Sequence, residues 1–136
     1  MTAPSILLVG NHIAWNKLLC SGSSNIANQI VQDSVSSKSE AIIAVEKYRP
    51  SLLVLDVKLK DSCGLALCQY YQQLKKPITT LILTSYDEDA YMTRALINGA
   101  IGYLLKTEEV ETICGAIQQA MRGKKLWTDY QLLRIR

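Results

Sequence analysis

The sequence predicts an α/β protein in which a parallel sheet is covered by helices on both faces. Four short apolar runs, Ser5–Gly10, Ser51–Asp56, Thr79–Ser85 and Ile101–Lys106, are continuous rather than alternating. Continuous runs are typical of parallel strands that are buried on both faces. Helical segments lie between the runs, and right-handed crossovers fold an alternating β–α order into such a sheet. At 136 residues the chain has the length of one domain.

Signals for two helices and a weaker strand follow the first strand. Ile13–Cys20 is a helical segment, and Asn28–Ser34 is a weaker strand with two β-branched residues at its centre. Ser37 and Glu40 have the spacing of a capping box, which indicates that a helix begins there. This helix should end before Pro50, because the residue that precedes a proline avoids the helical conformation.

The second half of the chain contains three more helical segments. Leu65–Leu74 lies between the third and fourth strands, and Ser85 and Glu88 repeat the capping-box spacing after the fourth. Gly99 suits the C-terminal cap of the helix that Ser85 starts. Thr107, with two acidic residues behind it, is predicted to cap the last long helix. The apolar stripe of that helix has helical spacing and consists of Val110, Ile113, Ile117 and Met121.

The C-terminal residues form a separate short unit. We predict a domain over residues 1–122, then a linker and the start of a helix over 123–136. Thr128 and Gln131 have capping-box spacing, but the helix that follows has only about two turns and is too short to be stable alone. It is either a docked extension or the beginning of a further domain.

Composition and charge exclude several classes of protein. An apolar fraction of 49% and a charged fraction of 20% are those of a globular protein. No apolar run approaches the ~18 residues that cross a bilayer, so we expect a soluble cytoplasmic protein without a membrane partner. From Arg122 onwards five basic residues face one acidic residue, a net charge of +4. The preceding residues have ten basic and eleven acidic side chains, a net charge of −1, which argues against nucleic-acid binding by this domain.

The cysteines carry no sign of a metal or disulfide framework. Cys20, Cys63, Cys68 and Cys114 form no CxxC pair, and His12 is the single histidine of the chain. Small buried apolar side chains are the preferred interpretation of these cysteines.

Polar side chains stand at the carboxyl ends of three predicted strands. In an open α/β sheet ligands bind at that edge. Asp56, Thr84 and Lys106 bring a carboxylate, a hydroxyl and an ammonium group there. Together they suit a phosphoryl site in which Asp56 is the nucleophile, Thr84 a hydrogen-bond donor and Lys106 a counter-charge. Taken singly, such residues are more often helix caps or solvated strand ends, so the prediction rests on their combination.

Three motifs resemble the receiver domain of two-component response regulators. They are Ser51–Asp56, Leu81–Thr84 and Asn98–Lys106, and the resemblance covers about nine-tenths of the chain. The stretch from Gly99 to Lys106 is similar to the NarL/FixJ branch, whose receivers usually precede a LuxR-type helix-turn-helix. The resemblance implies a flavodoxin-like (CheY-like) fold with five parallel strands in the order 2-1-3-4-5.

The resemblance also implies roles for individual residues. Asp56 is the implied phosphoacceptor, Thr84 and Tyr103 the switch pair, and Lys106 the residue that contacts the phosphoryl group. A histidine kinase is the implied donor. A homodimer or another protein partner is expected on the face formed by the fourth helix, the fifth strand and the fifth helix. DNA is expected to be bound only through an output domain beyond these residues.

The chain departs from the family pattern where receivers hold Mg²⁺. The family has two acidic residues after the first strand, and here these positions are Gly10 and Asn11. A hard cation prefers carboxylate oxygens, so Asn11 and Asp56 form a weak, degenerate metal site. Mg²⁺ remains a doubtful cofactor, and Mg²⁺-dependent phosphorylation of Asp56 is expected to be weakened or lost. Lys58 and Lys60 either replace part of the metal's charge or form a solvated loop, and we favour the loop.

The preferred interpretation is a regulatory domain rather than an enzyme. It is a pseudo-receiver that controls transcription through an output domain, and a conventional receiver that accepts a phosphoryl group on Asp56 is the alternative. A flavodoxin-like ligand-binding protein or enzyme is an alternative of another class, but the chain lacks the G-x-G-x-x-G and G-x-x-x-x-G-K motifs. A scaffold that only oligomerises is a third.

Overall fold

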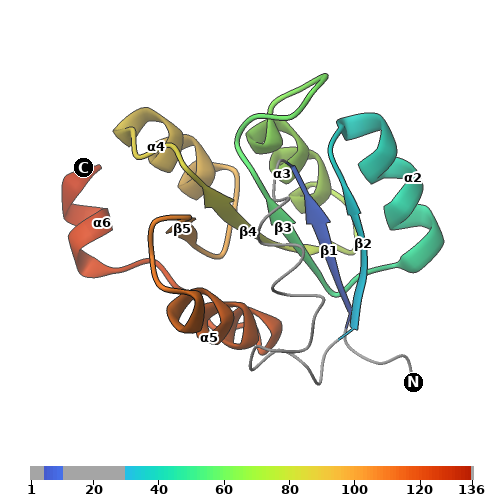
Figure 1. Ribbon diagram of the computed structural model, residues 1–136. Coiled ribbons are helices and arrows are strands. Elements are labelled where there is room, and N and C mark those ends of the chain that lie inside the picture. The colour runs from blue at the N-terminus through green and yellow to red at the C-terminus, as the bar shows by residue number, and fades with distance from the viewer. Residues whose placement is uncertain (1–4, 11–29, 136) are drawn as a thin grey trace.

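A five-stranded parallel sheet forms the centre of the computed structural model, which describes residues 5–10 and 30–135 (Figure 1). The strands are β1 (Ser5–Val9), β2 (Ile30–Val35), β3 (Leu52–Leu55), β4 (Thr79–Thr84) and β5 (Tyr103–Leu105). The helices are α2 (Lys38–Tyr48), α3 (Gly64–Gln72), α4 (Asp89–Ile97), α5 (Val110–Met121) and α6 (Asp129–Arg134). The helix predicted at Ile13–Cys20 lies outside the described residues.

The strand order is β2-β1-β3-β4-β5, and neighbouring strands are parallel throughout. This is the order that the resemblance implied. The predicted runs match the strands closely, although β5 begins at Tyr103, two residues later than expected. With β1 and β3 at the centre, β5 forms one edge of the sheet, and its far side faces α6 rather than another strand (Figure 1).

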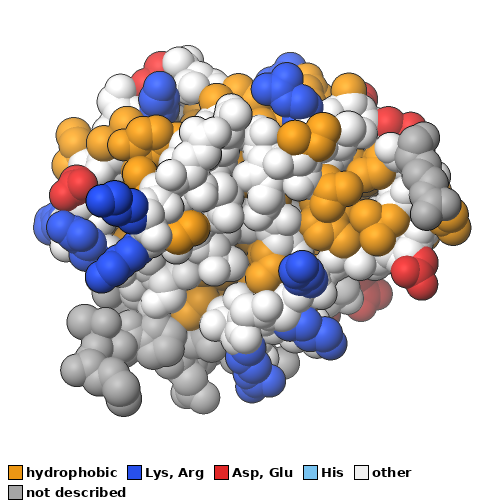
Figure 2. Space-filling model, turned by 180° about the vertical axis from the view of Figure 1, so that it is seen from behind, with side chains coloured by type: hydrophobic (Ala, Val, Ile, Leu, Met, Phe, Trp, Pro, Cys, Tyr) orange, Lys and Arg blue, Asp and Glu red, His pale blue; other side chains and the backbone are white. Residues whose placement is uncertain are grey.

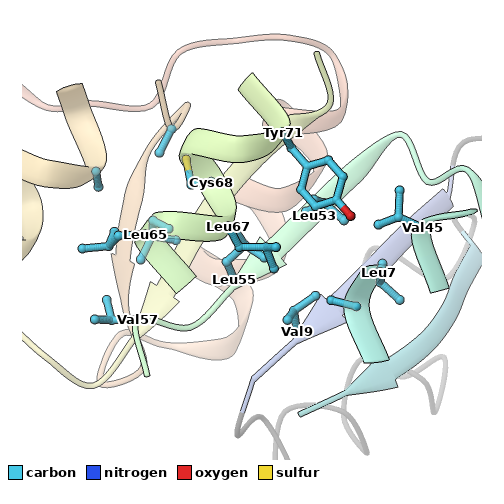
Figure 3. Packing of buried hydrophobic residues seen from close by; sticks show 14 of the residues in the cluster. Leu7, Val9, Val45, Leu53, Leu55, Val57, Leu65, Leu67, Cys68 and Tyr71 are labelled. Carbon is cyan, nitrogen blue, oxygen red and sulfur yellow. The ribbon is translucent and has the colours of Figure 1, made fainter. Parts of the chain in front are cut away.

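Alternate apolar residues of β1, β3 and β4 enter two separate apolar clusters, which explains why these runs are continuous. Leu7, Leu53 and Ile82 belong to the cluster under α2, α3 and α4 (Figure 3), whereas Leu8 and Leu81 belong to the cluster under α5. The strand residues of both clusters are buried. The stripe predicted for the last long helix packs as expected, with Ile113 and Ile117 fully buried against the sheet.

The N-terminus of α2 is capped by side chains from two parts of the chain. Ser37 accepts a hydrogen bond from the Glu40 backbone N–H at 3.1 Å, as its spacing predicts. Asp61, in the loop before α3, accepts from the Lys38 N–H at 2.7 Å and from the Ser39 hydroxyl at 2.8 Å. The sequence gives no signal for this second cap, because its residues are far apart in the chain.

The Asp61 cap makes stability depend on pH. The backbone N–H of Lys38, and then the hydroxyl of Ser39, hold the pKa of Asp61 below its usual value. A carboxyl group whose pKa is lower in the folded state stabilises the fold at pH values above its unfolded-state pKa. This stabilisation is lost as the pH falls through the folded-state pKa. We therefore expect Asp61→Asn to lower the melting temperature at pH 7, with the difference from wild type shrinking as the pH approaches 3. Thermal unfolding followed by circular dichroism across this range tests it, and a pH-independent difference would contradict it.

Two predicted helix starts are wrong. The helix predicted from Ser85 begins at Asp89 with Glu88 as its N-cap, and the helix predicted from Thr107 begins at Val110 with Glu109 as its N-cap. Neither N-cap residue makes a side-chain capping bond. The carbonyl groups of the loop after β4 bind other partners instead: that of Tyr86 accepts from the Tyr103 hydroxyl. Local spacing could not reveal this competition.

The end of α4 agrees with the sequence. Gly99 has a φ of 91°, and its N–H donates to the carbonyl of Leu96. The N–H of Ala100 donates to the carbonyl of Ala95. This pair of bonds is the Schellman motif, which requires a residue that tolerates positive φ. Similarly, Arg49 leaves the helical region with a φ of 50° before Pro50.

The remaining expectations concern membranes and cysteines. None of the helices in the described part of the chain has the length and hydropathy of a membrane span. Cys68 and Cys114 are buried, Cys63 is half-buried, and all three are free thiols. Burial raises the pKa of the Cys68 thiol, which lies 3.0 Å from the Thr80 hydroxyl, so this side chain is a packed, unreactive residue.

Candidate functional site

Asp56 lies directly after β3 and is 5% exposed. Both of its carboxylate oxygens have partners. Oδ1 accepts a hydrogen bond from the N–H of Val57 at 2.7 Å, and Oδ2 accepts one from Nζ of Lys106 at 2.8 Å. The backbone N–H of Asp56 donates to the carbonyl of Val9, which ties the residue to the end of β1. Asp56 is therefore held at the carboxyl edge of the sheet from three sides.

Lys106 reaches Asp56 across the end of β4. It follows β5, and its own backbone N–H donates to the carbonyl of Thr84 at 2.8 Å. The ammonium and carboxylate side chains are 13% and 8% exposed, so little water screens their ion pair. The pair joins residues that are 50 positions apart in the chain. The sequence placed both residues at this edge, and the structure brings them into contact.

Thr84 ends β4 and is fully buried. Its hydroxyl oxygen accepts a hydrogen bond from the N–H of Tyr86 at 3.3 Å. The hydroxyl thus holds the first turn of the loop that leads from β4 to α4. A change in the position of Thr84 must therefore move this loop.

Tyr103 points into the protein and is 2% exposed. Its hydroxyl donates a hydrogen bond to the carbonyl of Tyr86, and the N–H of the same Tyr86 donates to the hydroxyl of Thr84. Burial, and then the nearby carboxylates of Glu88 and Asp87, raise the pKa of Tyr103 above its ordinary range. The phenol is therefore neutral and a hydrogen-bond donor at neutral pH.

Receivers of the family have acidic residues at two positions after β1. The first of these positions is Gly10 in this chain, and it has no acidic side chain. Gly10 is buried, and its N–H donates to the carbonyl of Val35 at 2.8 Å. Its φ of 128° lies in the region that favours glycine, so a side chain here would strain the backbone. Asn11 and His12 lie outside the described residues.

The described residues do not fit a Mg²⁺ site. Mg²⁺ requires near-octahedral oxygen ligands and usually takes carboxylates. Both oxygens of the Asp56 carboxylate are already engaged, one by the Val57 N–H and the other by Lys106. No group of three potential acidic, histidine or cysteine ligands occurs among the described residues. Lys106 also places a positive charge 2.8 Å from Oδ2 of Asp56.

Lys58 and Lys60 lie in the exposed loop after Asp56. The ammonium group of Lys58 lies 4.6 Å from the centre of the Tyr86 ring, where it makes a cation–π contact. Within the described part of the chain neither lysine forms an ion pair with Asp56. This arrangement agrees with the solvated loop that we favoured.

Two residues of the site carried no functional prediction. A Cβ on Gly64 would lie 1.7 Å from the carbonyl oxygen of Asp56, so glycine is needed for α3 to approach the phosphoacceptor candidate. A glycine directly before an apolar helical run is a sequence signal for such a close approach. Tyr86 links Thr84, Tyr103 and Lys58 through its N–H, its carbonyl and its ring. No sequence pattern marks it.

Comparison with known proteins identifies the family of this chain. The family model of the response regulator receiver domain matches residues 6–118. The DNA-binding transcriptional activator DevR/DosR of Mycobacterium tuberculosis is 36% identical over 90 residues, which cover 66% of this chain and 42% of that protein. Response regulator protein VraR of Staphylococcus aureus is 30% identical over 108 residues, which cover 79% of this chain and 51% of that protein. The chain thus spans about half the length of the curated relatives it matches.

The fold is shared with solved structures at lower identity. A LuxR-family two-component response regulator from Aurantimonas superposes with a TM-score of 0.83 at 20% identity, over 98% of this chain and 96% of that one. The family model covers most of the strands and helices that build the site. The chain therefore belongs to the family of response regulator receiver domains.

Proposed function

We propose that this receiver domain is a pseudo-receiver in which Mg²⁺-dependent phosphorylation of Asp56 is weakened or lost. It acts as the signal-receiving part of a transcriptional regulator whose DNA-binding output domain lies outside these 136 residues. Its signal is a shift between two arrangements of the receiver, driven by a protein partner or a small ligand.

The engagement of Asp56 carries this proposal. The carboxylate has one ion-pair partner, Lys106, and a second hydrogen bond from the Val57 N–H, so its charge is balanced without a metal. A phosphoryl group on Asp56 adds negative charge, and Mg²⁺ bound by several carboxylates normally neutralises it. Here Gly10 has a positive φ, which favours glycine, and it brings no carboxylate to this edge. Among the described residues, Lys106 is then the cation paired with Asp56 that would neutralise a phosphoryl group.

A conventional receiver is the second candidate, and one observation favours it. Asp56, Thr84 and Lys106 lie together at the edge of the sheet, and the hydroxyl of Tyr103 reaches the loop that follows Thr84. This arrangement contains the nucleophile, the donor and the counter-charge of a phosphoryl site. In this candidate a histidine kinase supplies the phosphoryl group.

Intact-protein mass after incubation with a small-molecule phosphodonor separates the two candidates. We expect no phosphoryl adduct, or a far smaller one than an ordinary receiver gives under the same conditions, with or without Mg²⁺. Asp56→Asn is the control for labelling elsewhere. Asn11→Asp restores one acidic position without straining Gly10, and we expect it to increase labelling in the presence of Mg²⁺. A full adduct on the wild-type chain that needs both Asp56 and Mg²⁺ overturns the pseudo-receiver proposal.

A further inference from the structure

An open pocket lies between the C-terminal ends of α2 and α3. Its volume is about 580 Å³, which is within the range of small-molecule sites. Apolar side chains of both helices and of the loops that follow them form its walls: Ile42, Val45, Pro50, Leu74, Pro77 and Ile78. Pro50 and Ile78 come shortly before β3 and β4, so the pocket is at the opposite edge of the sheet from Asp56.

A buried hydroxyl of this pocket has no partner among the described residues. Tyr71, in α3, lines the pocket and is 3% exposed. Its hydroxyl points away from α3 towards Val45 of α2 (Figure 3) and forms no hydrogen bond within the described part of the chain. Buried hydroxyl groups are nearly always hydrogen-bonded, because an unpaired one has lost its contacts with water. The partner of this hydroxyl must therefore come from outside the chain.

The Tyr71 hydroxyl is available as a donor. Burial, and then the nearby Tyr70 and Glu46, raise the pKa of Tyr71 to about 12, so the phenol keeps its proton at neutral pH. The ring of Tyr70 contacts that of Tyr71 edge-on, with ring centres 4.9 Å apart and planes at 82°. A ligand group that meets this hydroxyl is therefore a hydrogen-bond acceptor, such as a carbonyl or hydroxyl oxygen.

Basic side chains outnumber acidic ones around the pocket. Arg49, Lys75 and Lys76 line it together with one carboxylate, that of Glu46, which gives three positive charges and one negative, a net charge of +2. Arg49 and Glu46 are 3.6 Å apart and largely exposed, so their attraction is weak. In Figure 2, Lys and Arg side chains gather beside apolar ones at the left, the side on which α2 lies. The charge favours an anionic ligand.

The position of Arg49 is one at which glycine is the easier residue. Arg49 follows α2 with a φ of 50°, and among the described residues no other residue except glycine has a positive φ. Glycine is the usual residue in this conformation after a helix. Residues that keep a side chain in such a conformation cluster at ligand sites. The chain thus retains a long cationic side chain beside the pocket at a cost in backbone energy.

We infer that the pocket between α2 and α3 binds a small organic acid, an apolar ring body with a carboxylate at one end and a hydrogen-bond acceptor at the other. The ring body contacts the apolar walls, and the acceptor takes the hydrogen bond of the Tyr71 hydroxyl. The carboxylate lies beside Arg49, Lys75 and Lys76, and the planar guanidinium group of Arg49 matches its shape. Binding does not depend on whether Asp56 accepts a phosphoryl group.

A ligand in this pocket can act on the loop that follows β3. Asp61 of this loop caps the N-terminus of α2, and Gly64 starts α3 against the carbonyl of Asp56. The ligand holds the opposite ends of the same two helices. It is thereby the small-ligand signal of the proposed function, and this role alone rests on that proposal.

Calorimetric titration of the full chain with a hydroxynaphthoate tests the site. The hydroxyl and the carboxylate of this probe are at opposite ends of the naphthalene. Two related compounds each lack one group: naphthoate has no hydroxyl, and naphthol has no carboxylate. We expect saturable binding of one hydroxynaphthoate per chain and weaker binding of the other two. No saturable binding at millimolar concentration overturns the inference, and so do equal affinities for the three compounds.

Tyr71→Phe tests the hydrogen bond. We expect it to weaken hydroxynaphthoate about fivefold, the value of one neutral hydrogen bond, and to leave naphthoate unchanged. The variant removes a buried hydroxyl without a partner among the described residues, so it should be as stable as wild type. Tyr130→Phe, which is exposed and outside this pocket, is the matched control. An unchanged affinity in Tyr71→Phe, or an equal loss for both compounds, contradicts the proposal.

The double variant Lys75→Gln with Lys76→Gln tests the charge. We expect it to weaken both carboxylates about fivefold and to leave naphthol unchanged. Lys124→Gln with Lys125→Gln removes the same charge from exposed residues outside this pocket and should bind as wild type does. Arg49→Gly should weaken the carboxylates while raising the melting temperature, because glycine prefers this backbone conformation. Equal losses in the two lysine pairs overturn the inference.

Asp56→Asn separates this site from the one at the carboxyl edge. We expect the variant to bind hydroxynaphthoate with the affinity of wild type. A loss of binding would place the ligand at Asp56 and overturn the inference. The phosphodonor experiment tests the proposed function by mass alone, so the failure of either proposal is recognised without the other.

Discussion

A Gly64→Ala variant should lose at least about 3 kcal/mol of its free energy of unfolding. The added Cβ would lie 1.7 Å from the carbonyl oxygen of Asp56 and 2.8 Å from its carbonyl carbon, so two backbone segments must separate. The N–H of Gly64 donates to the carbonyl of Val57 at 2.7 Å, and this bond would stretch or break. Urea denaturation followed by circular dichroism measures the loss.

The same substitution should displace Asp56, because the clash is with its own peptide group. Gly115→Ala is the matched control, since its Cβ meets nothing within 4 Å and it lies inside α5. In a helix interior alanine is favoured over glycine, so this control should gain roughly 0.5–1 kcal/mol. Equal stability changes in the two variants would show that the close approach of α3 to Asp56 is not tight.

Lys106→Met should lower the free energy of unfolding by about 3 kcal/mol, because it leaves the carboxylate of Asp56 buried without its counter-charge. Methionine keeps most of the length and apolar volume of the lysine stem, so lost packing contributes little. Urea denaturation at neutral pH measures the loss.

A double-mutant cycle assigns this loss to the ion pair. Asp56→Asn keeps an oxygen that can accept the Val57 N–H, and the Lys106 side chain can turn its ammonium group towards solvent. We expect the double variant Asp56→Asn with Lys106→Met to be more stable than Lys106→Met alone. Additive losses in the cycle would mean that the 2.8 Å contact contributes no coupling energy.

Local patterns in the sequence were sufficient for several elements of the fold. The continuous runs identified β1, β3 and β4 because the apolar residues of these strands enter one or the other of the two apolar clusters. Ser37 and Thr128 identified the starts of α2 and α6 because each cap is completed within four residues. The C-terminal cap at Gly99 is equally local. In each case the residues that decide the structure are neighbours in the chain.

Local helix-start signals failed at Ser85, where the spacing is that of a capping box, and at Thr107, where acidic residues follow the predicted cap. In the loop after β4, the carbonyl groups of Tyr86 and Asp87 bind Tyr103 and Arg134, and α4 begins beyond them. After β5, Lys106 turns towards Asp56, and α5 begins at Val110. The first residues of these loops make contacts within the site, and each helix begins after those residues.

For the site, the sequence by itself determined which groups reach the carboxyl edge, because strand ends place Asp56, Thr84 and Lys106 there whatever their contacts. It also determined that Gly10 brings no carboxylate to that edge. Only the tertiary structure decided that Lys106 pairs with Asp56 and that the C-terminal residues 123–135 lie against β5. Each of these contacts joins residues that are 28 or 50 positions apart. Strand order and register bring such residues together, and both depend on the packing of the whole sheet.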